Sequence, residues 1–330
     1  MYLYRSLWLM CVGLSVLLPC AAAAGEPADR PARPSPQRPD RRPLPKPPEN
    51  VTIQRDVVYG NAGNRPLHLD IIRPKKESDS PRPVICFIHG GGWRGGNKHS
   101  AIGALVPFAA SGDYVCATVE YRLSGEAIWP AQIHDCKAAI RWLKANARKY
   151  NIDPKRIGVW GGSAGGHLVS MLGTSGDVEE LEGDCGTPDQ SSRVACVVNF
   201  WGPSDFTRGK KCEGGREPSA VTALLGGPIE QNKAAAKAAS PVTHVTNDDP
   251  PVLTVHGTKD PVVPIEHGEI LHAALQKAGV ESVLVEVEGG GHGCRGAEVT
   301  KRVEAFFAKH LLGKDVEVSA EPIPARPPKR

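Results

Sequence analysis

Several features are scarce in this sequence, and each scarcity excludes a class of protein. Aromatic residues make up only 5% of the 330 residues, and beyond residue 24 no apolar run is long enough to cross a membrane. There is no Cys-x-x-Cys pair and no His/Cys cluster at zinc spacing, so we expect no metal site. Hydrophobic residues at 40% and charged residues at 23% are near the globular average, which excludes a wholly disordered or fibrous chain.

The central part of the chain also lacks an excess of basic charge. The Pro-rich segment 27–48 alone carries a net charge of +4, whereas residues 49–313 hold 29 basic and 30 acidic side chains. An enzyme of nucleic acids should carry a basic stripe on its folded face, so we expect no nucleic-acid partner. Proline clusters separate a leader (1–24), a basic linker (25–48), a catalytic domain (49–313) and a Pro-rich tail (314–330).

The leader has the pattern of a secretory signal peptide. Arg5 supplies a positive charge, an apolar run of twelve residues extends from Leu7 to Leu18, and the alanines at 22–24 offer a cleavage site. An uncleaved N-terminal anchor is the alternative, and Cys20 leaves a lipoprotein open, although Pro19 fits a lipidation site badly. We expect a secreted or periplasmic protein with no integral membrane span in the mature chain.

Seven of the nine cysteines lie beyond the leader, and an odd number cannot all pair with one another. Cys86, Cys116 and Cys196 lie within apolar, strand-like runs, where a thiol packs as a small hydrophobic group. Cys185 and Cys212 lie in polar loop sequence and are therefore a candidate disulfide pair in an exported protein.

Segments with strand and helix character alternate along the catalytic domain. We expect strands at 51–59, 67–72, 84–88, 114–119, 157–160, 195–200, 251–255 and 283–287, and helices at 131–150, 164–173, 266–278 and 299–312. This alternation predicts an α/β fold with a mostly parallel central sheet and helices on both faces. Functional residues are then expected on loops beyond the carboxyl ends of the strands.

The segment Gly161-Gly162-Ser163-Ala164-Gly165 lies between a predicted strand and a predicted helix, and it matches the G-x-S-x-G nucleophile elbow. In an elbow, a sharp turn lifts the serine hydroxyl clear of the sheet, and the glycines leave room where the two backbones approach. A Gly-rich turn without catalytic function is the alternative. We predict that Ser163 is a nucleophile.

A second glycine-rich loop, His89-Gly90-Gly91-Gly92-Trp93, directly follows the strand predicted at 84–88. Glycines let backbone N–H groups point toward a developing oxyanion without interference from a Cβ. We therefore predict an oxyanion hole formed by the amides of Gly91, Gly92 and Ala164. Taken alone, the three glycines would also fit a flexible turn.

A serine hydroxyl needs a base, and the base needs an orienting carboxylate. Asp260 follows the strand at 251–255 and His292 follows the strand at 283–287, which gives the chain order Ser, Asp, His. We predict that His292 is the general base and that Asp260 orients its imidazole. Activity should then fall on acidification, as the imidazole is protonated.

Other histidines and acidic residues compete for these roles. Several histidines are placed in or beside regular elements, or in a loop that they would brace: His89, His134, His167, His256 and His267. Asp248 and Asp249 precede their strand and so lie at its wrong end. Asp205 follows a strand and is either a pocket-wall residue or a helix cap.

Taken together, these motifs resemble the α/β-hydrolase fold, and within it the hormone-sensitive-lipase-like carboxylesterases, closest to the feruloyl/acetyl-xylan esterase (BD-FAE-like) branch. The resemblance extends over 55–312 and is carried by 89–93, 120–124, 130–135, 161–166, 260–264 and 291–293. It implies a serine ester hydrolase that forms an acyl-enzyme and needs no cofactor. Two features depart from the pattern: Cys294, where a bulky apolar residue is expected, and the polar segment 175–193, which we interpret as an insertion at the pocket rim.

We therefore expect an exported serine carboxylesterase that acts on short acyl esters of acetyl or feruloyl type, on small molecules or on polysaccharide. Trp93, Tyr121 and Asp205 are candidate substrate-binding residues. Two other functions stay open: a serine peptidase of the prolyl-oligopeptidase type, and a non-catalytic binding module on a hydrolase fold. The loop 89–93 fits esterases better than the peptidase, and the complete set of triad candidates argues against the binding module.

Overall fold

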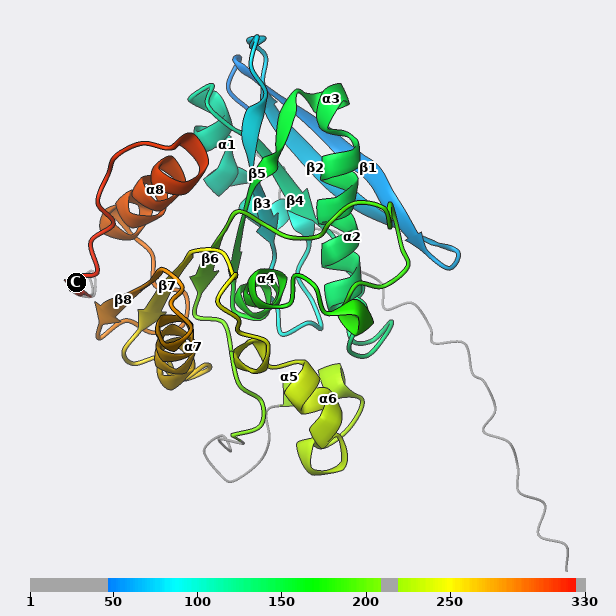
Figure 1. The fold of residues 1–330 in the computed structure, drawn as a ribbon, viewed down its shortest axis with the longest axis vertical. Helices are drawn as coiled ribbons and strands as arrows, with labels where there is room; N and C mark the ends of the chain where they lie inside the picture. Colours follow the sequence, from blue (N-terminus) through cyan, green and yellow to red (C-terminus); the bar gives the residue numbers. More distant parts are fainter. Residues whose placement is uncertain (1–46, 209–218, 325–330) are drawn as a thin grey trace, which may run out of the picture. The chain divides into compact units, whose positions relative to one another are not determined.

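The computed structural model describes residues 47–208 and 219–324, all within one structural unit (Figure 1). The predictions for the leader, for most of the linker and for Cys212 lie outside the described residues. The described part contains a nine-stranded sheet with the order β1-β2-β4-β3-β5-β6-β7-β8-β9. Strands β3 to β8 run parallel to one another, whereas β1 and β2 form an antiparallel hairpin whose second strand pairs antiparallel with β4.

The strands are β1 (Val51–Ala62), β2 (Arg65–Pro74), β3 (Arg82–Ile88), β4 (Val115–Val119), β5 (Ile152–Gly162), β6 (Cys196–Phe200), β7 (Val252–Gly257), β8 (Ser282–Glu288) and β9 (Ile323–Pro324). The helices are α1 (Ile102–Ala110), α2 (Ala131–Ala145), α3 (Ala147–Tyr150), α4 (Ala164–Thr174), α5 (Ser219–Leu225), α6 (Lys233–Ala238), α7 (Glu266–Lys277) and α8 (Ala297–Leu312). No helix in the described ranges is long and apolar enough to span a bilayer.

Two apolar layers hold the helices against the sheet. Helices α2, α4 and α7 bury one face, and α1 and α8 bury the other (Figure 1). Every residue of β4, β6 and β7 is buried, as expected for central strands covered on both sides. The predicted α/β class, with a mostly parallel sheet and helices on both faces, is therefore confirmed. Cys86, Cys116 and Cys196 are fully buried within these layers, as predicted.

The structure departs from the predicted elements in three places. The helix predicted at 131–150 breaks at Asn146, whose side-chain amide donates to the carbonyl oxygen of Trp142 at 2.9 Å and competes with the helical pattern there. Helix α1 and the short helices α5 and α6 were not predicted. A further strand, β9, lies in the segment interpreted as a Pro-rich tail, where Ile323 pairs with Val287 of β8.

The four loops that carry the predicted chemistry follow strands of the same parallel set. They begin after Ile88 of β3, Gly162 of β5, Gly257 of β7 and Glu288 of β8. Because parallel strands end at the same edge of a sheet, these loops lie together at the carboxyl edge.

Candidate active site

Ser163 occupies the turn between β5 and α4 in a strained backbone conformation. Its φ of 57° and ψ of −122° are rare for a residue with a side chain. The Ser163 amide donates to the Phe200 carbonyl oxygen at 2.9 Å, and the Ser163 carbonyl accepts from the His167 amide at 3.0 Å. These bonds to β6 and α4 hold the conformation, and the residue stays partly exposed.

Close backbone approach around this turn explains its glycines. A Cβ on Gly165 would overlap the carbonyl oxygen of Ile88 and lie 2.8 Å from that of His89. A Cβ on Gly90 would lie 2.6 Å from the Gly162 carbonyl oxygen and 3.4 Å from the Ser163 Cβ. The loop after β3 is therefore in direct contact with the elbow.

The loop after β3 holds two of the three residues whose amides are predicted to form the oxyanion hole. Gly91 and Gly92 have φ values of 118° and 60°, which favour glycine. The Gly91 carbonyl oxygen accepts from the amides of Arg94 and Gly95, both at 3.1 Å, and closes the loop. Within the described ranges, the amides of Gly91, Gly92 and Ala164 have no acceptor. Because Ala164 is the first residue of α4, its amide has no partner inside the helix.

Asp260 and His292 form the closest polar pair of the site. The Asp260 Oδ2 lies 2.8 Å from the His292 Nδ1, and Oδ1 accepts from the amides of Val262 at 2.8 Å and Val263 at 2.9 Å. Burial raises the pKa of Asp260, but hydrogen bonds from His256, His292 and the two amides outweigh burial and hold that pKa well below its usual range. Asp260 is therefore a charged partner for the imidazole.

Backbone bonds join the Asp260 loop to the His292 loop. The Lys259 amide donates to the Gly290 carbonyl oxygen at 2.9 Å, and the Thr258 amide donates to that of Val287 at 3.0 Å. The Gly289 amide donates to the Thr258 hydroxyl at 2.8 Å. The two loops thus hold the acid and the imidazole in a fixed relation.

Trp201 connects the imidazole to the elbow, although sequence reasoning gave it no role. Its ring centroid lies 5.9 Å from that of His292, and its Cζ2 would lie 3.4 Å from a Cβ on Gly162. A tryptophan directly after β6, at the carboxyl edge, was the available signal.

Ser163 Oγ and His292 Nε2 form no hydrogen bond in this structure. Such catalytic bonds often tighten only when substrate binds.

His256 is packed, as predicted, but it also faces the acid. It is fully buried in β7, and its Nε2 lies 2.8 Å from the Val263 carbonyl oxygen and 3.6 Å from Asp260 Oδ2. Donation to a carbonyl requires the proton on Nε2. Asp260 therefore has an imidazole on each side, of which only His292 is partly exposed.

The three predicted substrate-binding residues have internal partners. Tyr121 is fully buried, and its hydroxyl donates to the His89 carbonyl oxygen at 2.9 Å. Trp93 is 3% exposed and its indole donates to His167 Nδ1 at 3.2 Å. Both aromatic side chains therefore pack inside the protein around the loop after β3, and their role in substrate binding stays a prediction.

Asp205 also has an internal partner. Its Oδ1 accepts from the Thr207 amide at 2.8 Å and from the Thr207 hydroxyl at 2.6 Å, and the side chain is buried. These bonds fold a local turn, and a role of Asp205 at the pocket stays a prediction.

The segment 175–193, which we interpret as an insertion at the pocket rim, is bonded to α2. Lys137 of α2 donates to the Ser175 carbonyl oxygen and to Glu182 Oε1, the latter at 2.7 Å. Arg141 of α2 donates to the carbonyl oxygens of Glu182 at 2.9 Å and Cys185 at 2.8 Å. The segment is therefore held along α2.

The cysteines in the described part of the chain form no disulfide. Cys185 is a free thiol among the described residues, and its proposed pairing with Cys212 stays a prediction. Cys294 is partly exposed and packs against the apolar layer of α1 and α8, as a small wall residue would.

One group of side chains has the spacing of metal ligands, but a lysine already neutralises it. Ligand atoms of Asp56, Asp70 and His99 lie within 4.8 Å of one another. The Lys98 ammonium lies 2.6 Å from Asp56 Oδ1 and 3.1 Å from Asp70 Oδ1. A metal ion would have to displace this ammonium, so the group fits an ion-pair network better than a metal site.

The sheet order, the elbow after β5 and the acid and imidazole after β7 and β8 define an α/β-hydrolase. The sequence matches the BD-FAE family over residues 69–275, and the chain belongs to that family.

Several known proteins of similar sequence and structure are esterases. The chain is 32% identical to the probable carboxylic ester hydrolase LipM of Mycobacterium tuberculosis, over 82% of this chain and 64% of LipM. A truncated carbohydrate esterase from gut microbiota has a TM-score of 0.71 at 32% identity, over 81% of this chain and 99% of that one. The propionate-bound esterase Est2 of Thermogutta terrifontis has a TM-score of 0.64 at 29% identity, over 79% and 94%. The chain spans about three fifths of the length of the curated relatives LipM, LipC and LipQ.

Proposed function

We propose that this protein is a carboxylesterase in which Ser163 is the nucleophile, His292 is the general base and Asp260 orients the imidazole. One observation carries the proposal: the 2.8 Å contact between Asp260 Oδ2 and His292 Nδ1 lies at the same sheet edge as the strained Ser163 turn. Family membership supports the reaction class.

In the proposed mechanism, the Nδ1–H of His292 donates a hydrogen bond to the Asp260 carboxylate, which stays charged, and Nε2 is left as an acceptor. Nε2 takes the proton of the Ser163 hydroxyl while Oγ attacks the acyl carbon. The amides of Gly91, Gly92 and Ala164 stabilise the resulting oxyanion. Collapse breaks the bond to the alcohol, which receives the proton from Nε2, and water then hydrolyses the acyl-enzyme by the same steps.

For the substrate, we propose short acyl esters of acetyl or feruloyl type, including esters on polysaccharide. The likeness to a carbohydrate esterase supports a sugar-borne ester, and the propionate in the Thermogutta esterase supports a small acyl group. The signal-like leader at 1–24 supports export to a compartment where such polymers occur.

The first prediction tests the nucleophile. Ser163→Ala should lower turnover of p-nitrophenyl acetate by at least about 10³-fold, because removal of a triad nucleophile leaves only binding and oxyanion stabilisation. A fluorophosphonate probe should label the parent protein and not the variant. The measurement is the initial rate at neutral pH, together with mass spectrometry of the labelled chain.

Ser80→Ala is the matched control, because Ser80 is exposed and lies just before the amino end of β3, whereas the candidate active site lies at the carboxyl ends of the strands. It should keep full activity and labelling. Equal turnover by Ser163→Ala and the parent would refute the proposal. If aryl esters are turned over, a panel of acetylated xylan, feruloylated arabinoxylan and simple aryl esters ranks the substrates.

A further inference from the structure

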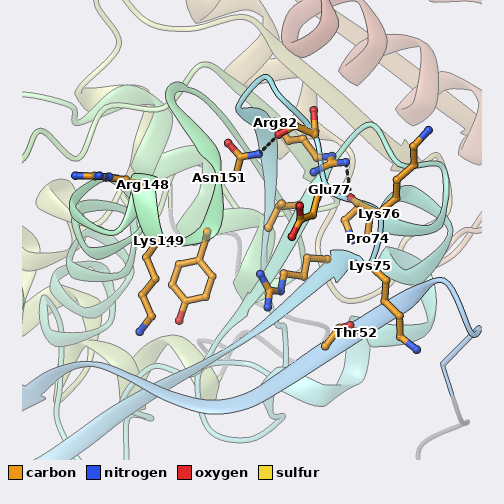
Figure 2. Close-up of a pocket in the computed structure, with 13 residues that line it drawn as sticks. Thr52, Pro74, Lys75, Lys76, Glu77, Arg82, Arg148, Lys149 and Asn151 are labelled. Atoms are coloured by element: carbon orange, nitrogen blue, oxygen red, sulfur yellow. Dashed lines mark hydrogen bonds between the residues drawn. The ribbon is translucent and has the colours of Figure 1, made fainter.

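A cavity of about 680 Å³ opens at the amino ends of the parallel strands. The end of β2, the starts of β1, β3 and β4, helix α3 and the residues directly after β2 and α3 line it (Figure 2). Strand β3 begins here at Arg82 and ends at Ile88, directly before the candidate oxyanion loop. The cavity and the candidate active site therefore lie at opposite ends of the same strand.

The lining is strongly basic. Glu77 is its only acidic residue, against six basic ones: Arg73, Lys75, Lys76, Arg82, Arg148 and Lys149. Arg82 donates to the carbonyl oxygens of Gly112 at 2.7 Å and Lys76 at 2.9 Å. None of the six forms an ion pair with a carboxylate in the described part of the chain. Clustered cations in a concave surface raise the local concentration of anions.

Tyr150 adds an aromatic side chain to the lining of this cavity. It is only 4% exposed, and its hydroxyl is closed off from solvent and has no hydrogen-bond partner among the described residues, so it offers no bond to a ligand in the cavity. The Lys149 ammonium lies 5.2 Å from the centre of its ring. Thr52 and Asn151 supply neutral polar groups in the lining, and the Asn151 side-chain amide already donates to the Ser78 carbonyl oxygen at 2.7 Å (Figure 2).

We propose that this cavity binds a short segment of acidic polysaccharide through its carboxylates. The cavity has the volume of sites that hold drug-sized ligands. Its basic side chains come from three separate chain segments, so several carboxylates on successive sugar units can face them, whereas one small ion cannot. The Thr52 hydroxyl and the Asn151 amide suit sugar hydroxyls. The choice of a sugar acid rests on the proposed function, because a polysaccharide substrate would bring such units to the protein.

The test measures binding of trigalacturonic acid to the full-length protein by calorimetry, with maltotriose as the neutral probe. We expect binding of trigalacturonic acid alone, weakened at high salt because exposed charges are screened. Arg148→Gln/Lys149→Gln should weaken it about three- to tenfold. The matched control, Lys237→Gln/Lys277→Gln, removes two exposed lysines from α6 and α7 and should leave the affinity unchanged.

Three results would overturn the proposal: no binding of trigalacturonic acid, equal affinity in the two double variants, or tripolyphosphate or a short oligonucleotide binding as tightly as the sugar acid. Ser163→Ala separates this proposal from the esterase. The variant should bind trigalacturonic acid as the parent does, whereas failure of the proposed function would show as absent aryl-ester turnover with the binding intact.

Discussion

At the scale of single residues, the two carboxylate oxygens of Asp260 have different hydrogen-bond partners. Oδ1 accepts two loop amides, whereas Oδ2 faces His292. An asparagine at this position keeps an acceptor for the amides and loses the charge that stabilises an imidazolium. We predict that Asp260→Asn lowers kcat by about 10³–10⁴-fold with little change in thermal stability. Steady-state kinetics and a melting curve check this, and a variant with near-parent kcat would contradict the role.

Glycine at position 165 is required by close approach, because a Cβ there would overlap the backbone oxygen of Ile88. Neither backbone can move without displacing the elbow or β3. Gly165→Ala should therefore lower the melting temperature by several degrees and abolish ester turnover. Gly103, inside α1, has open space around the same position, so Gly103→Ala should leave both unchanged or raise stability by about 0.5–1 kcal/mol. Equal melting temperatures for the two variants would contradict this explanation.

The sequence allowed prediction of the candidate triad, but not of the supporting side chains. Ser163, Asp260 and His292 each follow a strand whose apolar run is visible locally, and a parallel sheet brings such ends together. The partners of Tyr121 and Trp93 depend on which loops the fold packs over them, and no local pattern reports that. Their internal hydrogen bonds therefore could not be predicted from the sequence.

At the scale of elements, His167 ties helix α4 to two other segments. Its Nδ1 accepts from Trp93 at 3.2 Å, and its Nε2 donates to the Ala239 carbonyl oxygen at 2.7 Å, just after α6. Burial lowers the pKa of His167 to about 4, and burial likewise lowers the pKa of His89 to about 4. Both rings are therefore neutral in the folded protein at pH 7.

This neutrality predicts an acid-sensitive fold. In the unfolded chain these rings titrate near pH 6.5, so between about pH 6.5 and pH 4 the unfolded state binds more protons and stability decreases as the pH is lowered. Each ring should contribute a loss of about 2 kcal/mol at pH 5 relative to pH 7. Urea unfolding at the two pH values measures it, and His167→Gln should reduce the difference by that amount.

His244→Gln is the matched control for this experiment. The His244 Nε2 lies 2.9 Å from the Ala238 carbonyl oxygen, in a setting similar to that of His167, but the ring is partly exposed. The control should keep the pH dependence of the parent. A parent protein equally stable at pH 5 and pH 7 would contradict the neutral, buried state of His89 and His167.

Element boundaries were predictable where apolar periodicity was strong and unbroken. The segment 175–193 shows the opposite case, because its polar sequence gave no reason to place it against α2. Lys137 and Arg141 of α2 hold it there. Both are basic residues on the buried face of the helix, where a sequence pattern predicts apolar residues. Long basic side chains can be buried when carboxylates and carbonyls meet them, which sequence reasoning cannot see.

At the scale of the whole molecule, the sheet separates two polar regions. The candidate triad and oxyanion loop lie beyond the carboxyl ends of the parallel strands, and the basic cavity lies at the amino ends (Figures 1 and 2). A polymer that reached both would have to pass over the edge or face of the sheet. Substitutions in the cavity should therefore leave turnover of small aryl esters unchanged.

The edge of the sheet beside β8 is formed by a strand from the C-terminal segment. Ile323 of β9 is 8% exposed and pairs with Val287, and Pro324 pairs with Glu288, which directly precedes the loop of His292. Deletion of 314–330 would expose this apolar contact, at a cost of about 2–3 kcal/mol, and lower the melting temperature by roughly 5–10 °C. Deletion of 325–330 alone keeps β9 and should change nothing. Calorimetry of both truncations decides the point, because equal melting temperatures would mean that β9 does not stabilise the strand that carries the base.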